Sequence, residues 1–369
     1  MRILICVHSL SNGGAEHVAA LWANGFAERG HDVIVVLSDQ IEQYDFSLSS
    51  KVRVENIFIE GNPIIRYIKK LLLLRKLLCR IKPDVALAVL NPWSEWLLFT
   101  TIGLKTIVIN TEHDSFERPA SAPMRHSTYF RKFWLNKLFS AVTVLTEADK
   151  KIIGKRIRNV FVMPNPLAFE SCYYPNEKKQ IILAAGRLDQ WHVKGFDLLI
   201  NAWGKVAKKY PNWELQIAGR GDDHDIQRIM EWIRLNDVEE HTKILGFCSR
   251  FNDICRQASI FVLSSRYEGF GMVLIESMSQ GCAPVAADYM GRASEIITKP
   301  EEGFICAVES ENELAHCIEH LIENDALRQM IQKNAYYRSS YFSINNTIDR
   351  WYSIFKRLGL DKKLNKYID

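Results

Sequence analysis

Two series of alternating strand-like and helix-like patterns, separated by one irregular break, constrain the fold of this chain more than any other feature. In the first series, helical patterns such as 14–29 separate β-rich apolar runs near residues 2–7, 32–37, 53–59, 84–90, 106–110, 140–145 and 159–163. In the second, helical patterns such as 195–208 and 310–323 separate runs near 181–185, 213–218, 259–263, 283–286 and 304–307. Such alternation predicts parallel sheets with crossover helices.

The break at Met163-Pro-Asn-Pro166 predicts the domain boundary, because the segment from there to Lys179 is polar and has no clear period. We therefore expect two doubly wound α/β domains, an N-terminal one at 1–165 and a C-terminal one at 166–345. The last stretch, 346–369, is expected to be a helix that packs back on the first domain. Ligands of doubly wound sheets bind at the carboxyl ends of the strands, so a cleft between the two domains is the expected site.

Composition excludes several classes of protein. A net charge of +4 over 369 residues is too small to imply nucleic acid as a partner. The eight cysteines form no Cys-x-x-Cys pair and indicate a reduced, cytoplasmic protein. The short apolar start does not predict a secretory signal, and no apolar stretch is long enough to span a bilayer, so any membrane role is expected to be peripheral.

Candidate anion-binding groups follow the first strand of each domain. Gly13 and Gly14 open the first helix, where backbone amides favour a diphosphate, although for two adjacent glycines taken alone a tight strand-to-helix turn is the better explanation. Arg187 and Lys194 follow the first strand of the second domain, where two fixed cations suit a departing diphosphate. Isolated surface cations are nevertheless commoner than catalytic ones.

The strongest local signal is a glycine-rich loop between two glutamates. Glu268 precedes a helix expected to begin near Met272, and Glu276 lies one turn inside it. Carboxylates accept hydrogen bonds from vicinal hydroxyls, which a nucleotide sugar offers on both its ribose and its hexose. The alternative, one carboxylate at a helix N-terminus and one solvated glutamate, leaves the glycines at 269 and 271 unexplained.

The spacing of these glutamates, within residues 268–285, resembles the signature of the family 4 retaining glycosyltransferases, which have the GT-B fold. The resemblance extends over nearly the whole chain. It is carried by Gly13-Gly14-Ala15-Glu16, His113 in Thr-Glu-His-Asp, Pro164-Asn165-Pro166, Gly186-Arg187-Leu188, Lys194-Gly195 and Ile217-Ala-Gly-Arg-Gly221. The fold that it implies is GT-B, two Rossmann-like domains facing each other across a cleft.

The resemblance also implies roles for the matching residues. Arg187 and Lys194 would neutralise the donor diphosphate, Glu276 would bind the ribose, and Glu268 would contact the transferred sugar. His113 would lie against that sugar from the first domain, although without the family likeness a hydrogen bond to a neighbouring loop would be the preferred interpretation. Sugar hydroxyls and phosphate would be held by the amides of Phe270, Gly271 and Met272.

The chain departs from the family pattern in two places. Trp191 and His192 are extra residues before Lys194, and Met290 stands where a second glycine is common. The first departure affects the phosphate loop, and the second puts contacts from that turn in doubt. Asp223-His-Asp225 looks like a metal-binding motif, but its position predicts a helix cap, so no metal or other cofactor is expected.

The expected activity is transfer of a hexose or N-acetylhexosamine from a nucleotide diphosphate sugar, preferably uridine-linked, to a hydroxyl of a glycan. The acceptor is expected to be lipid-linked, in bacterial polysaccharide or oligosaccharide assembly, with retention following from the resemblance alone. Alternatives are a sugar-nucleotide epimerase of similar fold and a non-catalytic nucleotide-sugar binding protein. A dinucleotide-dependent oxidoreductase is disfavoured, because no strand is followed by the required glycine fingerprint.

The segment Ile64–Lys82 predicts contact with an anionic membrane, since it contains seven basic residues and no acidic one. A basic stripe is expected opposite an apolar side made of Ile68, Leu71, Leu74 and Leu78. A membrane contact of this kind predicts that the protein binds peripherally to the inner face of the plasma membrane. A second segment, Arg118–Phe139, also contains no acidic residue. For both segments the alternative is a helix that packs on its sheet and has a solvated basic face. The stripe comprises Arg66, Lys69, Lys70, Lys76 and Arg80.

Overall fold

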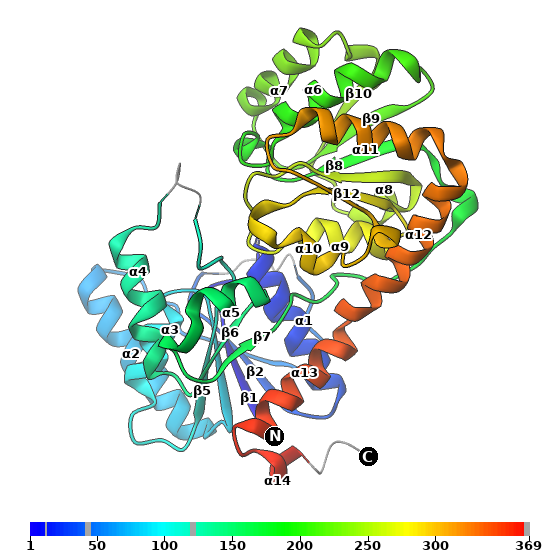
Figure 1. Cartoon of the computed structure of the whole chain (residues 1–369). Coiled ribbons are helices and arrows are strands. Elements are labelled where there is room, and N and C mark those ends of the chain that lie inside the picture. The colour runs from blue at the N-terminus through cyan, green and yellow to red at the C-terminus, as the bar shows by residue number, and fades with distance from the viewer. Residues whose placement is uncertain (12, 41–45, 119–122, 365–369) are drawn as a thin grey trace. The chain divides into compact units, whose positions relative to one another are not determined.

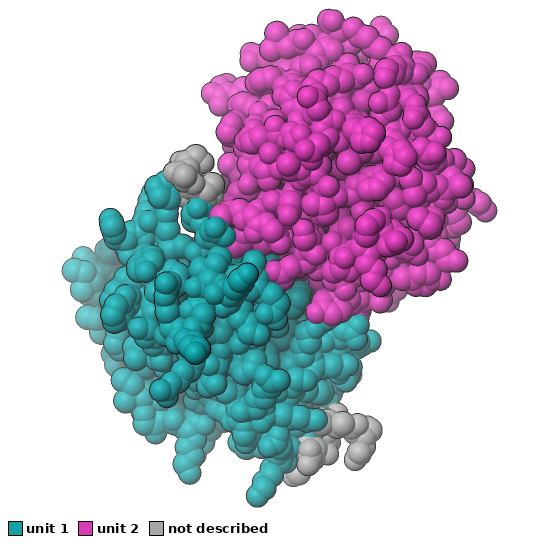
Figure 2. All heavy atoms as spheres, viewed as in Figure 1, with its two compact units in different colours: residues 1–168, 344–369 teal, residues 169–343 magenta. Residues whose placement is uncertain are grey.

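The computed structural model describes residues 1–11, 13–40, 46–118 and 123–364. The chain divides into two compact units (Figure 2). Unit 1 comprises Met1–Ala168 together with Ile344–Asp369, and unit 2 comprises Phe169–Ser343. The first unit is therefore built from both ends of the chain, and the second is a single continuous segment.

Unit 1 is built on a seven-stranded sheet whose order is β3-β2-β1-β4-β5-β6-β7, with every neighbouring pair parallel. Its inner strands are apolar on both faces, which is the composition that parallel sheets covered by helices require. Their bounds are β1 Arg2–Cys6, β2 Asp32–Leu37, β3 Arg53–Asn56, β4 Val85–Val89, β5 Ile107–Thr111, β6 Ala141–Val144 and β7 Val160–Val162.

Helices cover both faces of this sheet (Figure 1). A core cluster that includes Leu74, Trp93 and Ile153 joins one face of the sheet to the helices that follow β3, β4 and β6. The helices of this part of the chain are α1 Gly14–Glu28, α2 Pro63–Ile81, α3 Trp93–Thr100, α4 His126–Phe133 and α5 Glu147–Ile153.

The C-terminal helices α13 (Ile344–Arg357) and α14 (Asp361–Leu364) belong to unit 1. Figure 1 shows α13 beside α1. Trp351 of α13 is fully buried and packs edge-on against Trp22 of α1, with ring centroids 5.1 Å apart. Residues 365–369 of the expected terminal helix lie outside the described part of the chain.

Unit 2 has a six-stranded parallel sheet of order β10-β9-β8-β11-β12-β13. The strands are β8 Lys179–Ala185, β9 Glu214–Ala218, β10 Thr242–Gly246, β11 Ala258–Leu263, β12 Ala283–Ala287 and β13 Phe304–Cys306. The helices are α6 Phe196–Val206, α7 Asp223–Leu235, α8 Phe251–Gln257, α9 Met272–Ser279, α10 Ala293–Ile296, α11 Glu311–Glu323 and α12 Asp325–Ser339. Because β8 and β11 are central neighbours, their carboxyl ends bring two distant loops together.

Candidate active site

Lys194 and Glu268 form an ion pair at the carboxyl ends of β8 and β11. Lys194 Nζ donates to Glu268 Oε1 over 2.7 Å, and the two side chains are only 17% and 11% exposed. Ser265 Oγ donates to the same oxygen over 2.8 Å. The structure therefore places the candidate cation for a phosphate directly against the candidate carboxylate for a sugar.

The loop that carries Glu268 is shaped by close packing beneath it. Gly271 has a φ of +95°, and a Cβ at this position would lie 2.5 Å from the hydroxyl of Tyr289. That hydroxyl is buried and donates to the carbonyl of Phe270 over 2.7 Å. Because the first N–H groups of a helix have no partner within it, the backbone at Gly271 and Met272 presents donors at the start of α9.

Glu276 lies one turn inside α9 and is only 8% exposed. Burial raises the pKa of its carboxyl to about 7. Within the described residues, this side chain makes no hydrogen bond or ion pair. A buried carboxylate without compensation is costly, and vicinal hydroxyls of a ligand are groups that would compensate it.

Arg187 is placed differently from Lys194. Its guanidinium is 64% exposed and is hydrogen-bonded to Asp189, with Nε 3.0 Å from Oδ1 and Nη2 2.5 Å from Oδ2. The hydrogen bond from Arg187 lowers the pKa of Asp189. A phosphate ligand therefore has to compete with Asp189 for this guanidinium.

The glycine loop of unit 1 is also occupied by a carboxylate. Gly13 is the N-cap of α1, and a Cβ added to it would lie 1.8 Å from Oε2 of Glu16. Burial raises the pKa of Glu16. An anion at this helix N-terminus would have to displace Glu16, a competition that the sequence pattern at Gly13 and Gly14 did not predict.

His113 follows β5 and is held locally by unit 1. Its Nε2 lies 3.1 Å from Thr111 Oγ1, and its ring centroid is 5.5 Å from that of Trp22. Burial disfavours the charged form of the ring and lowers the pKa of His113 to about 4, although a hydrogen bond with the side chain of Asn165 acts in the opposite direction. The ring is therefore neutral at pH 7.

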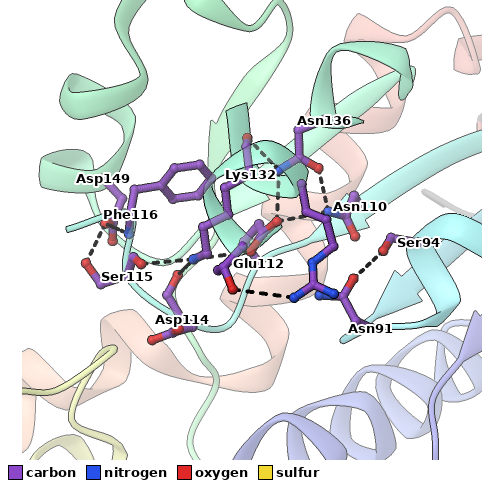
Figure 3. Close-up of polar contacts among 12 residues, drawn as sticks. Asn91, Ser94, Asn110, Glu112, Asp114, Ser115, Phe116, Lys132, Asn136 and Asp149 are labelled. Atoms are coloured by element: carbon purple, nitrogen blue, oxygen red, sulfur yellow. Dashed lines mark hydrogen bonds and ion pairs between the residues drawn. The ribbon is translucent and has the colours of Figure 1, made fainter. Parts of the chain in front are cut away.

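A network of polar contacts braces the segment on either side of His113 (Figure 3). Buried Lys132 donates to the carbonyls of Asp114 and Ser115 and pairs with Glu112 at 3.4 Å. The carboxylate of Asp149 accepts from the hydroxyl of Ser115 and the amide of Phe116. The sequence pattern did not predict this network, because its members are 17 to 34 positions apart in the chain and only the fold brings them together.

The structure corrects the expected arrangement of α2. Lys70 does not belong to an exposed basic stripe: it is buried, and its Nζ donates to the carbonyl of Ser38 over 2.7 Å. Ile68 does not lie on the buried side, since it is 52% exposed. Arg80 is exposed but paired with Glu55 at 2.7 Å. The exposed face of α2 thus mixes cations with large apolar side chains, because the sheet lies against Leu74, Leu77, Leu78 and Ile81.

The motif at Asp223–Asp225 sits at a helix start, one residue away from the expected cap. Asp222 is the N-cap of α7, and its side chain accepts from the amide of Asp225. The side chain of Asp225 in turn accepts a hydrogen bond from the Asp222 amide, which completes a capping box. Asp222, His224 and Asp225 have ligand atoms within 4.8 Å of one another, but the capping role accounts for both carboxylates.

Two family models match consecutive parts of the chain. Residues 12–170 match the model described as Glycosyltransferase Family 4, and residues 173–338 match the one described as glycosyl transferases group 1. An uncharacterized glycosyltransferase of Haemophilus influenzae is 26% identical over 358 residues, which are 93% of this chain and 96% of that protein. A Campylobacter jejuni protein is 25% identical over 366 residues, which are 95% of this chain and 97% of that protein. It is named for α-1,4-N-acetyl-D-galactosaminyl transfer to a GalNAc-containing saccharide on diphospho-undecaprenol.

Solved structures resemble the whole chain. HepE of Anabaena, crystallised with UDP and glucose, has a TM-score of 0.79 at 19% identity and covers 97% of this chain and 100% of its own. TarM has a TM-score of 0.79 at 15% identity, over 96% of this chain and 98% of its own. Identities this low show the fold alone, and that fold is GT-B.

Two α/β units, each built on a parallel sheet, together with the match of the whole chain to solved structures of this fold, define a glycosyltransferase of the GT-B class. The chain belongs to glycosyltransferase family 4, with both of its family models matched in order, and it is a transferase enzyme. Within the described residues, no helix is both long and apolar enough to cross a bilayer.

Proposed function

We propose that the protein transfers a hexose or N-acetylhexosamine from a UDP-sugar to a hydroxyl of a lipid-linked glycan, with retention of the anomeric configuration. The bond from the anomeric carbon to the diphosphate oxygen breaks, and UDP leaves with the bonding electrons. The acceptor hydroxyl oxygen forms the new bond to that carbon, and its proton passes to the departing diphosphate. No metal or other cofactor takes part in this proposal. The protein contributes positioning and stabilisation of the departing charge.

The ion pair of Lys194 and Glu268 carries the proposal. A lysine held at 2.7 Å by a glutamate is fixed in place before any ligand arrives. A donor diphosphate would attract Lys194 more strongly than one carboxylate does, because it carries more negative charge. Glu268 would then be released to accept hydroxyls of the sugar that is attached to that diphosphate.

Glu276 and Arg187 complete the proposed donor site. The buried carboxyl of Glu276 would accept the ribose hydroxyls, and exposed Arg187 would move from Asp189 to the diphosphate. Uridine as the base is supported by the solved relatives that contain UDP, among them HepE with UDP and glucose. His113, neutral at pH 7, would be a hydrogen-bonding partner for the sugar rather than a cation.

The lipid-linked acceptor is supported by the relatives and by the surface of unit 1. Two Campylobacter jejuni relatives are named for transfer to saccharides on diphospho-undecaprenol. On α2, Ile64, Ile65 and Leu72 are 72%, 55% and 65% exposed, next to the exposed cations Arg66, Lys69 and Lys76. Apolar side chains that enter the bilayer and cations that meet lipid phosphates, at about 1 kcal/mol each, bind a peripheral protein to an anionic membrane.

A second exposed apolar group belongs to α4 and the turn after it. Phe130 and Trp134 are 58% and 57% exposed, and Tyr129 is 47% exposed. Aromatic side chains of this kind favour the interface between water and lipid. Lys132 and Phe133 of the same segment face the protein interior and do not contribute to this surface.

The test combines donor binding with turnover. The purified protein is incubated with a panel of UDP-sugars, and thermal unfolding shows which are bound, since a ligand at 100 times its Kd stabilises by about 2.7 kcal/mol. With the bound donor, acceptor-dependent release of UDP and a lengthened glycan are expected. Conversion of one UDP-sugar into another without UDP release would instead identify an epimerase, and binding without either reaction a non-catalytic protein.

A further inference from the structure

Arg266, two residues before Glu268, uses all five of its N–H donors within unit 2. It makes a bidentate pair with Asp197, with Nη1–Oδ1 at 2.7 Å and Nη2–Oδ2 at 2.8 Å. It makes a second bidentate pair with Glu309, with Nε–Oε1 at 2.5 Å and Nη2–Oε2 at 3.1 Å. The remaining Nη1 donor goes to the carbonyl of His192 over 2.5 Å.

These contacts join the loop that carries Glu268 to the loop that carries Lys194. His192 lies two residues before Lys194, and Asp197 lies in the first turn of α6. Two further hydrogen bonds join the loops. The amide of Arg266 donates to the carbonyl of Val193 over 2.9 Å, and the side-chain Oγ of Ser264 donates to the carbonyl of Lys194 over 3.0 Å.

The two loops are packed in close contact with each other. Gly195 has a φ of +66°, and a Cβ there would lie 2.1 Å from the carbonyl oxygen of Ser264. On the far side, Trp191 packs on the core of unit 2 and lies 6.3 Å from Trp232, measured between ring centroids. The extra residues Trp191 and His192 are therefore anchored at one end by the core and at the other by Arg266.

We propose that Arg266 is a positioning residue that sets the distance between Lys194 and Glu268, and that the backbone carbonyls of His192 and Val193 are the groups that hold it to the Lys194 loop. A lysine could not replace it, because an ammonium has three donors and lacks the planar fork that serves two carboxylates at once. This inference rests on the proposed function, in which Lys194 and Glu268 act on one donor. A displacement of about 1 Å between such groups costs on the order of 10²-fold in rate.

The test compares Arg266→Lys with Arg328→Lys. Arg328 is a matched control because its side chain is 12% exposed, against 15% for Arg266, and it also combines a carboxylate with backbone carbonyls. Its partners Leu321, Ile322 and Asp325 all lie where α11 meets α12. Both variants lose a guanidinium fork of similar burial, but only Arg266 touches the two loops.

Two measurements are made on each variant. For Arg266→Lys, kcat is expected to fall about 10²-fold with a KM for the donor within about threefold of wild type, while Arg328→Lys keeps its kcat. Amide hydrogen exchange in peptides covering 188–195 and 264–271 is expected to become about tenfold faster in Arg266→Lys and to stay unchanged in Arg328→Lys. A second and milder variant, Glu309→Gln, removes the charge of one carboxylate that pairs with Arg266. We expect it to lower kcat and to speed exchange in the same peptides, by smaller factors.

The exchange measurement needs no activity, so it separates this inference from the proposed function. If the wild type transfers no sugar but Arg266→Lys loosens both loops, the link between the loops stands and the function is wrong. If the wild type transfers sugar and Arg266→Lys exchanges and turns over like Arg328→Lys, the positioning role is wrong.

Discussion

Lys194 and Glu268 lie 74 residues apart in the sequence and are joined Nζ to Oε1 at 2.7 Å, with Ser265 donating to the same oxygen. Each charge is the main compensation for the other in a site that is mostly closed to water. Removing one therefore leaves the other without its partner. The two residues are expected to behave as a coupled pair and not as independent contributors.

A double-mutant cycle tests this coupling. Lys194→Ala is expected to lower kcat on the order of 10²-fold, because it removes a cation from the departing diphosphate. Adding Glu268→Ala should cost less than the product of the two single losses, with a coupling of about 1 kcal/mol or more. Steady-state kinetics of the four proteins measures it.

The control for this cycle is the exposed pair of Lys205 and Glu311, which lies on the surface of the same unit. Lys205→Ala should leave kcat unchanged, since exposed pairs contribute little. If the loss of kcat in the double variant equals the product of the losses in the two single variants, the contact between Lys194 and Glu268 has no energetic consequence for turnover.

Glu276 and Glu268 are expected to divide the donor between them. Glu276→Gln should weaken binding of free UDP about tenfold, because a neutral amide is a poorer acceptor for ribose hydroxyls than a carboxylate. Glu268→Gln should leave UDP affinity nearly intact and depress transfer. Isothermal titration with UDP measures the first effect, and equal losses of UDP affinity in the two variants would contradict the division.

The raised pKa of Glu276 predicts a pH dependence of stability. Its folded value of about 7 exceeds the ordinary value of 4.5, so the folded state prefers the protonated carboxyl. The stabilisation is fully present below pH 4.5 and is lost as pH rises through 7, with a limit of about 3 kcal/mol. Denaturant unfolding at pH 5.5 and 8 should show this loss in wild type and a smaller one in Glu276→Gln. The same pH dependence in both proteins would mean that Glu276 ionises normally when buried.

Most of the fold follows from the sequence, and the missed elements have physical reasons. Buried parallel strands such as Val85–Val89 are continuous apolar runs, which the pattern identifies directly. The strand β10, Thr242–Gly246, was not predicted, because it is an edge strand with only one buried residue. Helix α12 was missed for a related reason: its surface is mostly polar, and few of its side chains are buried.

The candidate site was only partly predictable. Lys194 and Glu268 stand out because each follows a strand in a glycine-containing loop. Arg266 does not stand out, because its importance depends on Asp197 and Glu309, which only the folded chain brings to it. Lys70 was misplaced for the opposite reason: cations and leucines alternate around all of α2, so the periodicity alone does not identify the buried face.

The last prediction concerns the membrane. Changing Arg66, Lys69 and Lys76 together to Gln removes three exposed cations from α2 without touching its buried face. Co-sedimentation with vesicles containing anionic lipid should fall at least about tenfold, because each surface cation contributes about 1 kcal/mol to binding. Transfer to a lipid-linked acceptor in such vesicles should fall with it, whereas transfer to a short soluble acceptor should not.

The matched control changes Arg234, Lys299 and Lys333 to Gln, which removes the same charge from exposed positions of unit 2. This control should sediment like wild type if membrane binding depends on the cations of α2 and not on the net charge of the protein. Replacing Ile65 and Ile68, both more than half exposed, with Ser tests the apolar part, and should weaken binding even in high salt, where the electrostatic part is screened. Equal sedimentation of wild type and both α2 variants would exclude this face of unit 1 as the membrane contact, and the exposed aromatic side chains of α4 would then be changed next.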